Sequence, residues 1–383
     1  MKNLILLLLC AVLGACATPS ALPSPEPYFH DELFATSAQH DGANAVFALS
    51  DAMKRFVHVD IARQLRTEGL ARGLINALYR RDQLKLDYDS ASTRNAAQAF
   101  DARKGNCLSL VIMTAAFAKE LGLQVTYQTV AIEETWSRSD DILFSNTHVN
   151  LTLATRAVHA MPGYEESRML TIDFLPAEYI LGQRTRPISE DTVVAMYMNN
   201  RAAEALAQGQ VDEAYWWARA AIVRAPVFSS AYNTLGVAYL RHGDLQAAEW
   251  VLSRLLEREP QDKHAMSNLA AVLDRLGRVD ESSALRVRLV RMEPYPPYYF
   301  FRLGVAAMRR GDFEVAKSLF SKEVDRADYS SEFHFWLGIA HLRLGDAEEA
   351  RKQIKTAMEN STTSSEHEIY AAKLNRLQSH GAR

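Results

Sequence analysis

Cysteine and net charge are both scarce in this sequence. Only three of the 383 residues are cysteines, and 43 lysine and arginine side chains nearly balance 46 aspartates and glutamates. Such a balance gives no broad positive field to attract a polyanionic backbone, so binding to DNA or RNA is disfavoured. Because the length exceeds what one hydrophobic core commonly supports, we expect two folded domains.

Hydrophobic runs long enough to span a membrane are also missing. The apolar stretch from Leu4 to Leu13, which follows Lys2, is too short to cross a hydrocarbon core of about 30 Å and is typical of a secretion signal. It ends in Leu13-Gly14-Ala15-Cys16, which resembles the lipobox of bacterial lipoproteins. The alternative is a chance cysteine at the end of a signal.

The lipobox resemblance implies that residues 1–15 are removed and that Cys16 becomes an acylated first residue. Each buried methylene contributes about 0.8 kcal/mol, so several acyl chains would anchor the protein in a membrane. Residues 16–28 are rich in Ala, Pro and Ser and are expected to form an extended tether. Ala17, rather than an aspartate, follows the cysteine. By the usual sorting rule this indicates the outer membrane of a bacterial cell envelope, with the body facing the periplasm.

Motifs for metals and phosphates are absent as well. The sequence has neither CxxC nor HExxH, and no glycine-rich loop precedes a predicted helix. We therefore expect no metal and no other cofactor. With Cys10 in the signal and Cys16 acylated, Cys107 is the remaining thiol, and it is either buried and inert or kept for its reactivity.

The second half of the chain has a 34-residue period. It is marked by glycines and prolines at the same interval: Gly209, Gly243, Gly277, Gly311 and Gly345, and Pro226, Pro260 and Pro294. Asp244, Asp312 and Asp346 follow turn glycines, where they are expected to cap the second helix of a pair. This pattern resembles the tetratricopeptide repeat, in five copies over residues 195–362, with residues 363–383 as a capping helix or tail. The resemblance implies an all-α solenoid that binds a protein or peptide partner.

An arginine ladder accompanies the repeats. The period places an arginine two positions before four of the turn glycines: Arg241, Arg275, Arg309 and Arg343. Either each arginine complements the C-terminus of its own helix, which contributes about 0.3–1 kcal/mol, or the row captures carboxylates of an acidic partner. In the second interpretation Tyr298, Phe301 and Phe335 are expected to form apolar pockets beside the ladder.

Residues 29–190 have no such period and contain Cys107. Apolar spacing predicts helices between Phe47 and Tyr79 and over Thr93 to Ala102. After a break at residues 103–106, Cys107 opens a helix that Gly122 ends. A cysteine in the first turn of a helix experiences the positive end of the helix dipole and several unsatisfied N–H groups, both of which favour the thiolate.

Two alternating segments follow, His148 to Leu153 and Leu170 to Phe174, and each predicts a strand with one buried face. Alternation puts His148 and Asp173 on the less apolar faces, so antiparallel neighbours would bring the carboxylate to the imidazole. Cys107, His148 and Asp173 would then act as nucleophile, base and orienting group. His159 and Glu178 are nearby alternatives, and a lone strand histidine or aspartate is more often an ordinary polar residue.

These segments resemble the bacterial transglutaminase-like superfamily over about residues 85–180. The similarity rests on Gly105-Asn106-Cys107-Leu108-Ser109-Leu110 before a long helix, then a strand histidine, then a strand aspartate followed by Leu175-Pro176. It implies an α+β papain-like domain over residues 29–190 and a Cys-His-Asp triad for peptide hydrolysis, deamidation or amide transfer, although some members are inactive. Many members carry an aromatic residue two positions after the histidine, where this chain has Asn150.

Two classes of function remain open. In the first, the protein is an envelope enzyme that attacks amide bonds of a protein or peptide recruited by the repeats. In the second, it is a non-catalytic assembly or adaptor protein whose repeats bind a partner and whose first domain is a scaffold. The Cys-His-Asp order favours the first class, and the missing aromatic residue favours the second.

Overall fold

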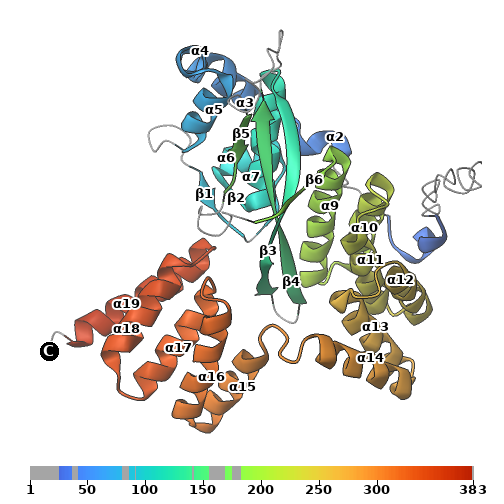
Figure 1. Cartoon of the computed structure of the whole chain (residues 1–383), viewed down its shortest axis with the longest axis vertical. Coiled ribbons are helices and arrows are strands. Elements are labelled where there is room, and N and C mark those ends of the chain that lie inside the picture. Colours follow the sequence, from blue (N-terminus) through green and yellow to red (C-terminus); the bar gives the residue numbers. More distant parts are fainter. Residues whose placement is uncertain are drawn as a thin grey trace, which may run out of the picture.

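The computed structural model of the chain describes residues 26–36, 42–79, 86–90, 92–139, 142–154, 169–174 and 183–381. A part built around a sheet is followed by a helical array that curves around it (Figure 1). Among the described residues no helix is long and apolar enough to cross a membrane. The predicted signal, Cys16 and the alternatives His159 and Glu178 lie outside the described residues.

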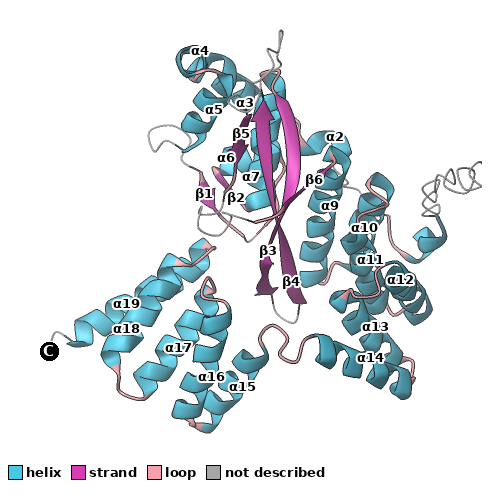
Figure 2. Ribbon diagram, in the orientation of Figure 1, coloured by secondary structure: helices cyan, strands magenta, loops and turns pink. Residues whose placement is uncertain are grey.

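The part before Glu190 combines short helices with two sheets (Figure 2). Its helices are α2 (Ala43–Val46), α3 (Asp51–Arg55), α4 (Ala62–Glu68), α5 (Leu70–Tyr79), α6 (Ala96–Ala102) and α7 (Cys107–Glu120). Its strands are β1 (Asp87–Tyr88), β2 (Lys104–Gly105), β3 (Gln124–Ser139), β4 (Ile142–Ala154), β5 (Met169–Ile172) and β6 (Thr185–Ile188). As predicted, Cys107 is the first residue of its helix.

The main sheet is antiparallel, with the strand order β5-β4-β3-β6. Strands β4 and β5 pair so that Leu151 lies opposite Ile172. Asp173, which directly follows β5, therefore lies beside the polar face of β4. The smaller sheet is a parallel pair in which Tyr88 of β1 lies opposite Gly105 of β2. The chain just before Cys107 is therefore held beside Tyr88.

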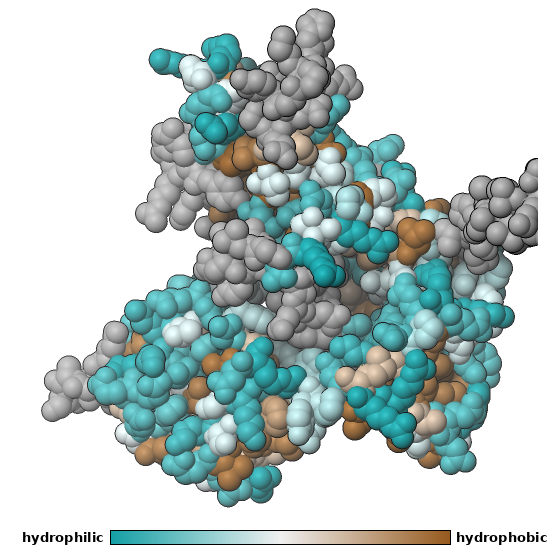
Figure 3. Space-filling model, in the orientation of Figure 1, coloured by the Kyte–Doolittle hydropathy of each residue, from teal (hydrophilic) through white to brown (hydrophobic). Residues whose placement is uncertain are grey.

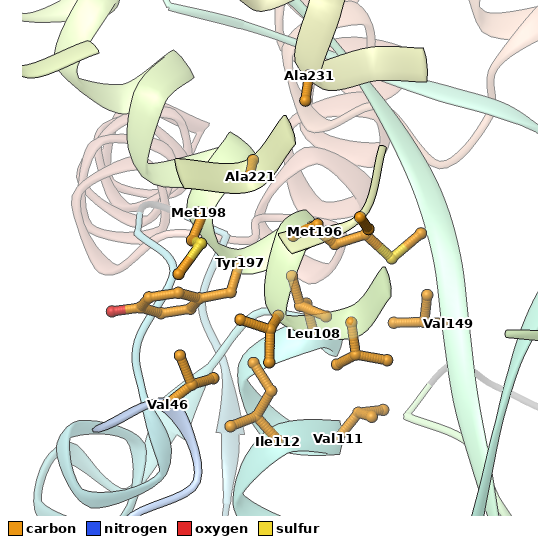
Figure 4. Packing of buried hydrophobic residues seen from close by; sticks show 14 of the residues in the cluster. Val46, Leu108, Val111, Ile112, Val149, Met196, Tyr197, Met198, Ala221 and Ala231 are labelled. Atoms are coloured by element: carbon orange, nitrogen blue, oxygen red, sulfur yellow. The ribbon is translucent and has the colours of Figure 1, made fainter. Parts of the chain in front are cut away.

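Helix α7 is buried on all sides, from Leu108 to Ala118. It packs against β3, β4 and α9 (Glu190–Ala207), the first helix of the array. Figure 4 shows Leu108, Val111 and Ile112 of this helix in the same cluster as residues of α9. Helix α9 begins at Glu190, at the predicted boundary of 190–195, and one hydrophobic core extends across it from Phe34 to Leu273.

The array consists of five helix pairs and a final helix. These are α9 with α10 (Val211–Arg224), α11 (Ser229–His242) with α12 (Leu245–Arg258), α13 (Lys263–Arg275) with α14 (Val279–Met292), α15 (Tyr299–Arg310) with α16 (Phe313–Arg326), α17 (Ser331–Arg343) with α18 (Ala347–Glu359), and α19 (Ser364–Gly381). The periodic turn glycines all have positive φ, between 73° and 105°, a backbone region that favours glycine.

Close helix packing and N-capping explain most of the other periodic residues. A Cβ atom at Gly304 would lie 2.6 Å from Cε1 of Phe320, so only glycine fits there. Asp244 and Asp346 accept N-cap hydrogen bonds from backbone N–H groups, as predicted. Asp312 makes no such bond and instead accepts one from the Arg310 side chain (2.9 Å).

The array is divided at the junction between α14 and α15. Helix α10 packs on α11, α12 on α13 and α16 on α17, whereas α14 and α15, both fully described, are not packed along each other. The linker Glu293–Tyr298, which contains three prolines, joins them (Figure 1). The buried residues of α15–α17 form a cluster of their own. The predicted helical solenoid is present and consists of two blocks, α9–α14 and α15–α19.

Residues 26–36, which we call the N-terminal strap, lie against the first two helix pairs. The buried ring of Phe34 stacks on Tyr215, with ring centroids 3.8 Å apart. The Tyr215 hydroxyl donates a hydrogen bond to Asp31 (2.6 Å), to which Arg219 also donates (2.8 Å). The sequence interpretation ended the tether at residue 28, but the backbone carbonyl of Tyr28 already accepts a hydrogen bond from the repeats.

The last block also contacts the first part of the chain. The backbone N–H of Ser90 donates to the carbonyl of Thr362 (3.1 Å), and the two side-chain hydroxyls are 2.7 Å apart. The array thus meets the first part at both of its ends, through α9 in the core and through Thr362 at Ser90.

Candidate active site

The loop that presents Cys107 is fixed by side-chain hydrogen bonds. Asn106 is the N-cap of α7, and its side chain accepts from the backbone N–H (2.9 Å) and the hydroxyl (2.7 Å) of Ser109. Ser109 Oγ in turn accepts from the backbone N–H of Arg94 (2.8 Å). A Cβ atom at Gly105 would lie 2.7 Å from Cβ of Ser109, so this position requires glycine. Cys107 is left half-buried at the start of the helix.

The same network continues into the first repeat. The Asn106 amide donates to Thr93 Oγ1 (2.9 Å), which also accepts from Asn200 on α9 (3.2 Å). The backbone N–H of Thr93 donates to the carboxyl group of Glu204, also on α9 (2.6 Å). Burial raises the pKa of Glu204, and the hydrogen bond from Thr93 and the charge of Arg201 offset only part of this rise. The cap that positions Cys107 is therefore tied to α9.

His148 and Asp173 meet across the β4–β5 pair. Both side chains are buried, and His148 Nε2 lies 2.6 Å from Asp173 Oδ1. The second carboxylate oxygen accepts a hydrogen bond from the Asn150 amide (3.0 Å). Since His148 and Asn150 are two residues apart on one strand, they share a face and both reach the carboxylate. Asn150, which replaces the aromatic residue of many superfamily members, thus has a role of its own here.

Cys107 and His148 interact electrostatically. Burial alone would lower the pKa of His148, but hydrogen bonds to Asp173 and Cys107, together with the negative charges of both groups, raise this pKa to about 9. With Nε2 engaged by Asp173, Nδ1 is the ring nitrogen available to the sulfur. At neutral pH the site therefore favours the imidazolium form of His148 beside the sulfur of Cys107.

Tyr88 is a site residue that the sequence analysis missed. Tyr88 is 41% exposed overall, but desolvation of its hydroxyl and the negative charge of Cys107 raise the pKa of this tyrosine, while a hydrogen bond with the backbone N–H of Cys107 acts in the opposite direction. The hydroxyl thus remains protonated beside the N–H group, where the oxyanion of an acyl-transfer reaction would form. The parallel pairing of β1 with β2 places it there, and local sequence gives no signal of that contact.

The described residues contain no group of three or more His, Cys, Asp and Glu side chains arranged to hold a metal ion. Cys107, His148 and Asp173 are the residue types that a nucleophilic site combines: a sulfur nucleophile, an imidazole that transfers a proton and a carboxylate that orients the ring.

The predicted partner residues are placed in two different environments. The four ladder arginines all lie at the ends of the first helices of their pairs, and Arg275, Arg309 and Arg343 are exposed. Arg275 donates to the carbonyl of Leu240 near the end of α11 (2.6 Å), and Arg343 lies over the ring of Phe313 (4.8 Å to the centroid). Both contacts are with neighbouring helices, so neither is the contact with the C-terminus of its own helix that the first interpretation predicts.

The aromatic residues do not line a surface. Tyr298 and Phe301 are each 4% exposed and form part of the core of the second block. Phe335 stacks on Tyr370 of α19, with ring centroids 4.8 Å apart. The expected apolar pockets beside the arginine ladder are therefore not formed by these side chains, because the helices use them to pack against one another.

Comparison with known proteins identifies the repeats. The tetratricopeptide repeat family matches residues 233–286 and 301–364. The chain carries tetratricopeptide repeats, which are protein-interaction modules. No curated protein matches the chain.

Several solved structures resemble parts of the chain. MamA from Desulfovibrio magneticus is 22% identical, covers 43% of this chain and 94% of its own, and has a TM-score of 0.26. A thermophilic repeat protein of Thermus thermophilus is 19% identical, with coverage of 47% and 98% and a TM-score of 0.29. YrrB, described as a repeat protein with an unusual peptide-binding site, is 17% identical, with coverage of 47% and 92% and a TM-score of 0.25. With identities and TM-scores this low, these structures give no information about the residues around Cys107.

Proposed function

We propose that the protein is a cysteine-dependent acyl-transfer enzyme that acts on amide bonds of a protein or peptide bound by its repeats. The observation that supports this proposal is the contact of His148 with both Asp173 (2.6 Å) and Cys107 at the start of a helix. The arrangement fits a transglutaminase-like, papain-like domain in the first part of the chain. We also propose that Cys16 is acylated and anchors the protein at the outer membrane, facing the periplasm.

The reaction follows from the charge state of the site. The Cys107 thiolate attacks the amide carbonyl carbon, and the developing oxyanion is stabilised by the backbone N–H of Cys107 and the hydroxyl of Tyr88. As the C–N bond breaks, the His148 imidazolium gives its proton to the leaving amine. A thioester remains. Neutral His148 then takes a proton from water, which hydrolyses the thioester, or from an amine, which forms a new amide.

A labelling experiment tests the nucleophile. The full chain is treated with an iodoacetamide probe at neutral pH, and we expect fast modification at Cys107 that falls at least about tenfold in His148→Ala, because the thiolate loses its imidazolium partner. His58→Ala is the matched control, since His58 also pairs with a carboxylate, Glu120 (2.8 Å), but at an exposed site. Equal rates in all three proteins would refute the ion pair.

A second assay follows the chemistry. Glutamine-containing peptides are incubated with the protein and a fluorescent primary amine, and release of ammonia and incorporation of the amine are both measured. Wild-type activity that is lost in Cys107→Ala and Asp173→Asn supports the proposal, and Tyr88→Phe is expected to lower the rate about 10²-fold. If Cys107 reacts rapidly with the probe but no amide is processed, the thiol is activated without being an amide-transfer nucleophile for these peptides.

The adaptor function is the alternative, and the repeats support it. If Cys107 is unreactive in the folded protein, the first part is a scaffold and partner binding by the array is the activity. Complementation of a deletion strain with wild type and with Cys107→Ala separates the two, because an adaptor retains its function without the thiol and an enzyme does not. Fractionation of Cys16→Ser tests the anchor, and we expect this variant to leave the membrane fraction.

A further inference from the structure

The junction between α14 and α15 exposes apolar side chains. Val290 on α14 is 60% exposed and Leu303 on α15 is 44% exposed. Apolar surface is visible over both helices, on either side of the linker (Figure 3). Side chains of this kind are normally buried between neighbouring pairs of a repeat array.

The 34-residue period identifies the equivalent residues at the other three junctions. The equivalents of Val290 are Ile222, Leu256 and Val324, and those of Leu303 are Leu235, Leu269 and Leu337. Ile222 and Leu235 are 0% exposed, Leu337 is 4% and Leu269 is 7%, while Leu256 and Val324 pack against the cores of their blocks. The same pair of positions is therefore buried or partly buried at the other three junctions and exposed at this one, although its residues are equally apolar.

The start of α15 departs from the period as well. Helices α13 and α17 begin at Lys263 and Ser331, which are equivalent to Pro297, but α15 begins two residues later, at Tyr299. Proline is favoured at the first position of a helix, yet here Pro297 lies outside it. Tyr298 has a φ of 63°, a left-handed conformation that bulky residues rarely adopt. The joint between the blocks is therefore strained.

We propose that the exposed faces of α14 and α15 are the two halves of one repeat–repeat interface, and that the array closes on it by rotation about residues 293–298. In the closed array, α15 of the same chain covers the exposed face of α14. On closure Pro297 and Tyr298 join the helix, and Val290 and Leu303 become buried. The inner surfaces of the two blocks then form one continuous groove, which suits an extended peptide longer than either block holds alone.

Distances between spin labels test this closure. Three pairs of exposed residues are equivalent by the period, Arg254 with Arg275, Arg288 with Arg309, and Lys322 with Arg343. Each pair is replaced by cysteines in the full chain, with Cys10, Cys16 and Cys107 changed to serine, and is spin-labelled. The first and third pairs report the distance across packed junctions. We expect the Arg288–Arg309 pair to show a population at that same distance beside a longer one.

Two controls decide the outcome. Leu303→Lys should abolish the short Arg288–Arg309 distance without changing the Arg254–Arg275 distance, and Leu337→Lys, the equivalent change at a packed junction, should disturb the Lys322–Arg343 pair. The proposal is overturned if the middle pair shows no short distance, or if Leu303→Lys leaves that distance unchanged. It is also overturned if an excess of unlabelled chain removes the short distance, because the occupant would then be a second copy.

Discussion

Replacing Phe320 with alanine should unfold the second block of the array without unfolding the rest. The Phe320 side chain is fully buried, and its ring lies 5.7 Å from Phe301 and 6.0 Å from Trp336, centroid to centroid. Truncation of such a phenylalanine costs about 3–5 kcal/mol. The block from α15 to α19 has about 80 residues, for which 1 kcal/mol shifts the melting midpoint by roughly 4–8 °C. We therefore expect its midpoint to fall by about 12–40 °C.

Calorimetry of the full chain, together with the fluorescence of Trp336, measures this transition. Because the second block has its own hydrophobic cluster, we expect two transitions in the wild type, and only the one reported by Trp336 should move in Phe320→Ala. Leu255→Ala is the matched control, since Leu255 is 2% exposed in the core shared by the first part and the first block. It should lower the other transition. A single transition that both substitutions shift together would refute the division into two blocks.

Three further predictions concern the site and the strap. The raised pKa of His148 means that its protonation stabilises the fold fully below about pH 6.5, and that this contribution is lost as the pH rises through about 9. The difference in unfolding free energy between wild type and His148→Gln, measured by urea titration, should therefore shrink over that range. Gly105→Ala forces a Cβ atom against Ser109, so probe labelling of Cys107 should slow at least several-fold while the melting of the second block is unchanged; normal labelling would contradict the fixed loop. Phe34→Ala removes the stack on Tyr215, and cleavage within residues 26–36 by endoproteinase Glu-C should become at least about tenfold faster than in Leu33→Ala, because Leu33 is 37% exposed and Phe34 is 5% exposed.

The features that sequence predicts best are local. The 34-residue period locates the turn glycines and the helix pairs because each pair repeats the same short-range packing. The break at residues 103–106 places Cys107 at a helix start, because Asn106 caps the helix and Gly105 fits where a Cβ would not. Alternation finds the segments of β4 and β5 that carry His148 and Asp173, and their pairing follows from antiparallel neighbours.

The features that sequence could not predict depend on distant contacts. The strap is held by residues such as Tyr215, 185 positions away from His30, and no local pattern encodes that contact. Tyr88 reaches Cys107 only through the pairing of β1 with β2. The 34-residue period also gives a wrong expectation at one junction. It implies the same helix packing at every junction, whereas α14 and α15 are not packed along each other. Tyr298 and Phe301 resemble pocket residues by type, but burial is decided by which helices meet.

The N-terminal strap determines how a mechanical load would enter the molecule. If Cys16 is anchored, any pull from the membrane reaches the folded body first at residues 26–36. The strap contacts two helix pairs through the Phe34 ring, the Asp31 carboxylate and the Tyr28 and Ala35 carbonyls. A pulling force would therefore load these contacts together, in shear, and would not open them one by one. Tension would then pass into α10 and α11, the two helices whose side chains hold the strap.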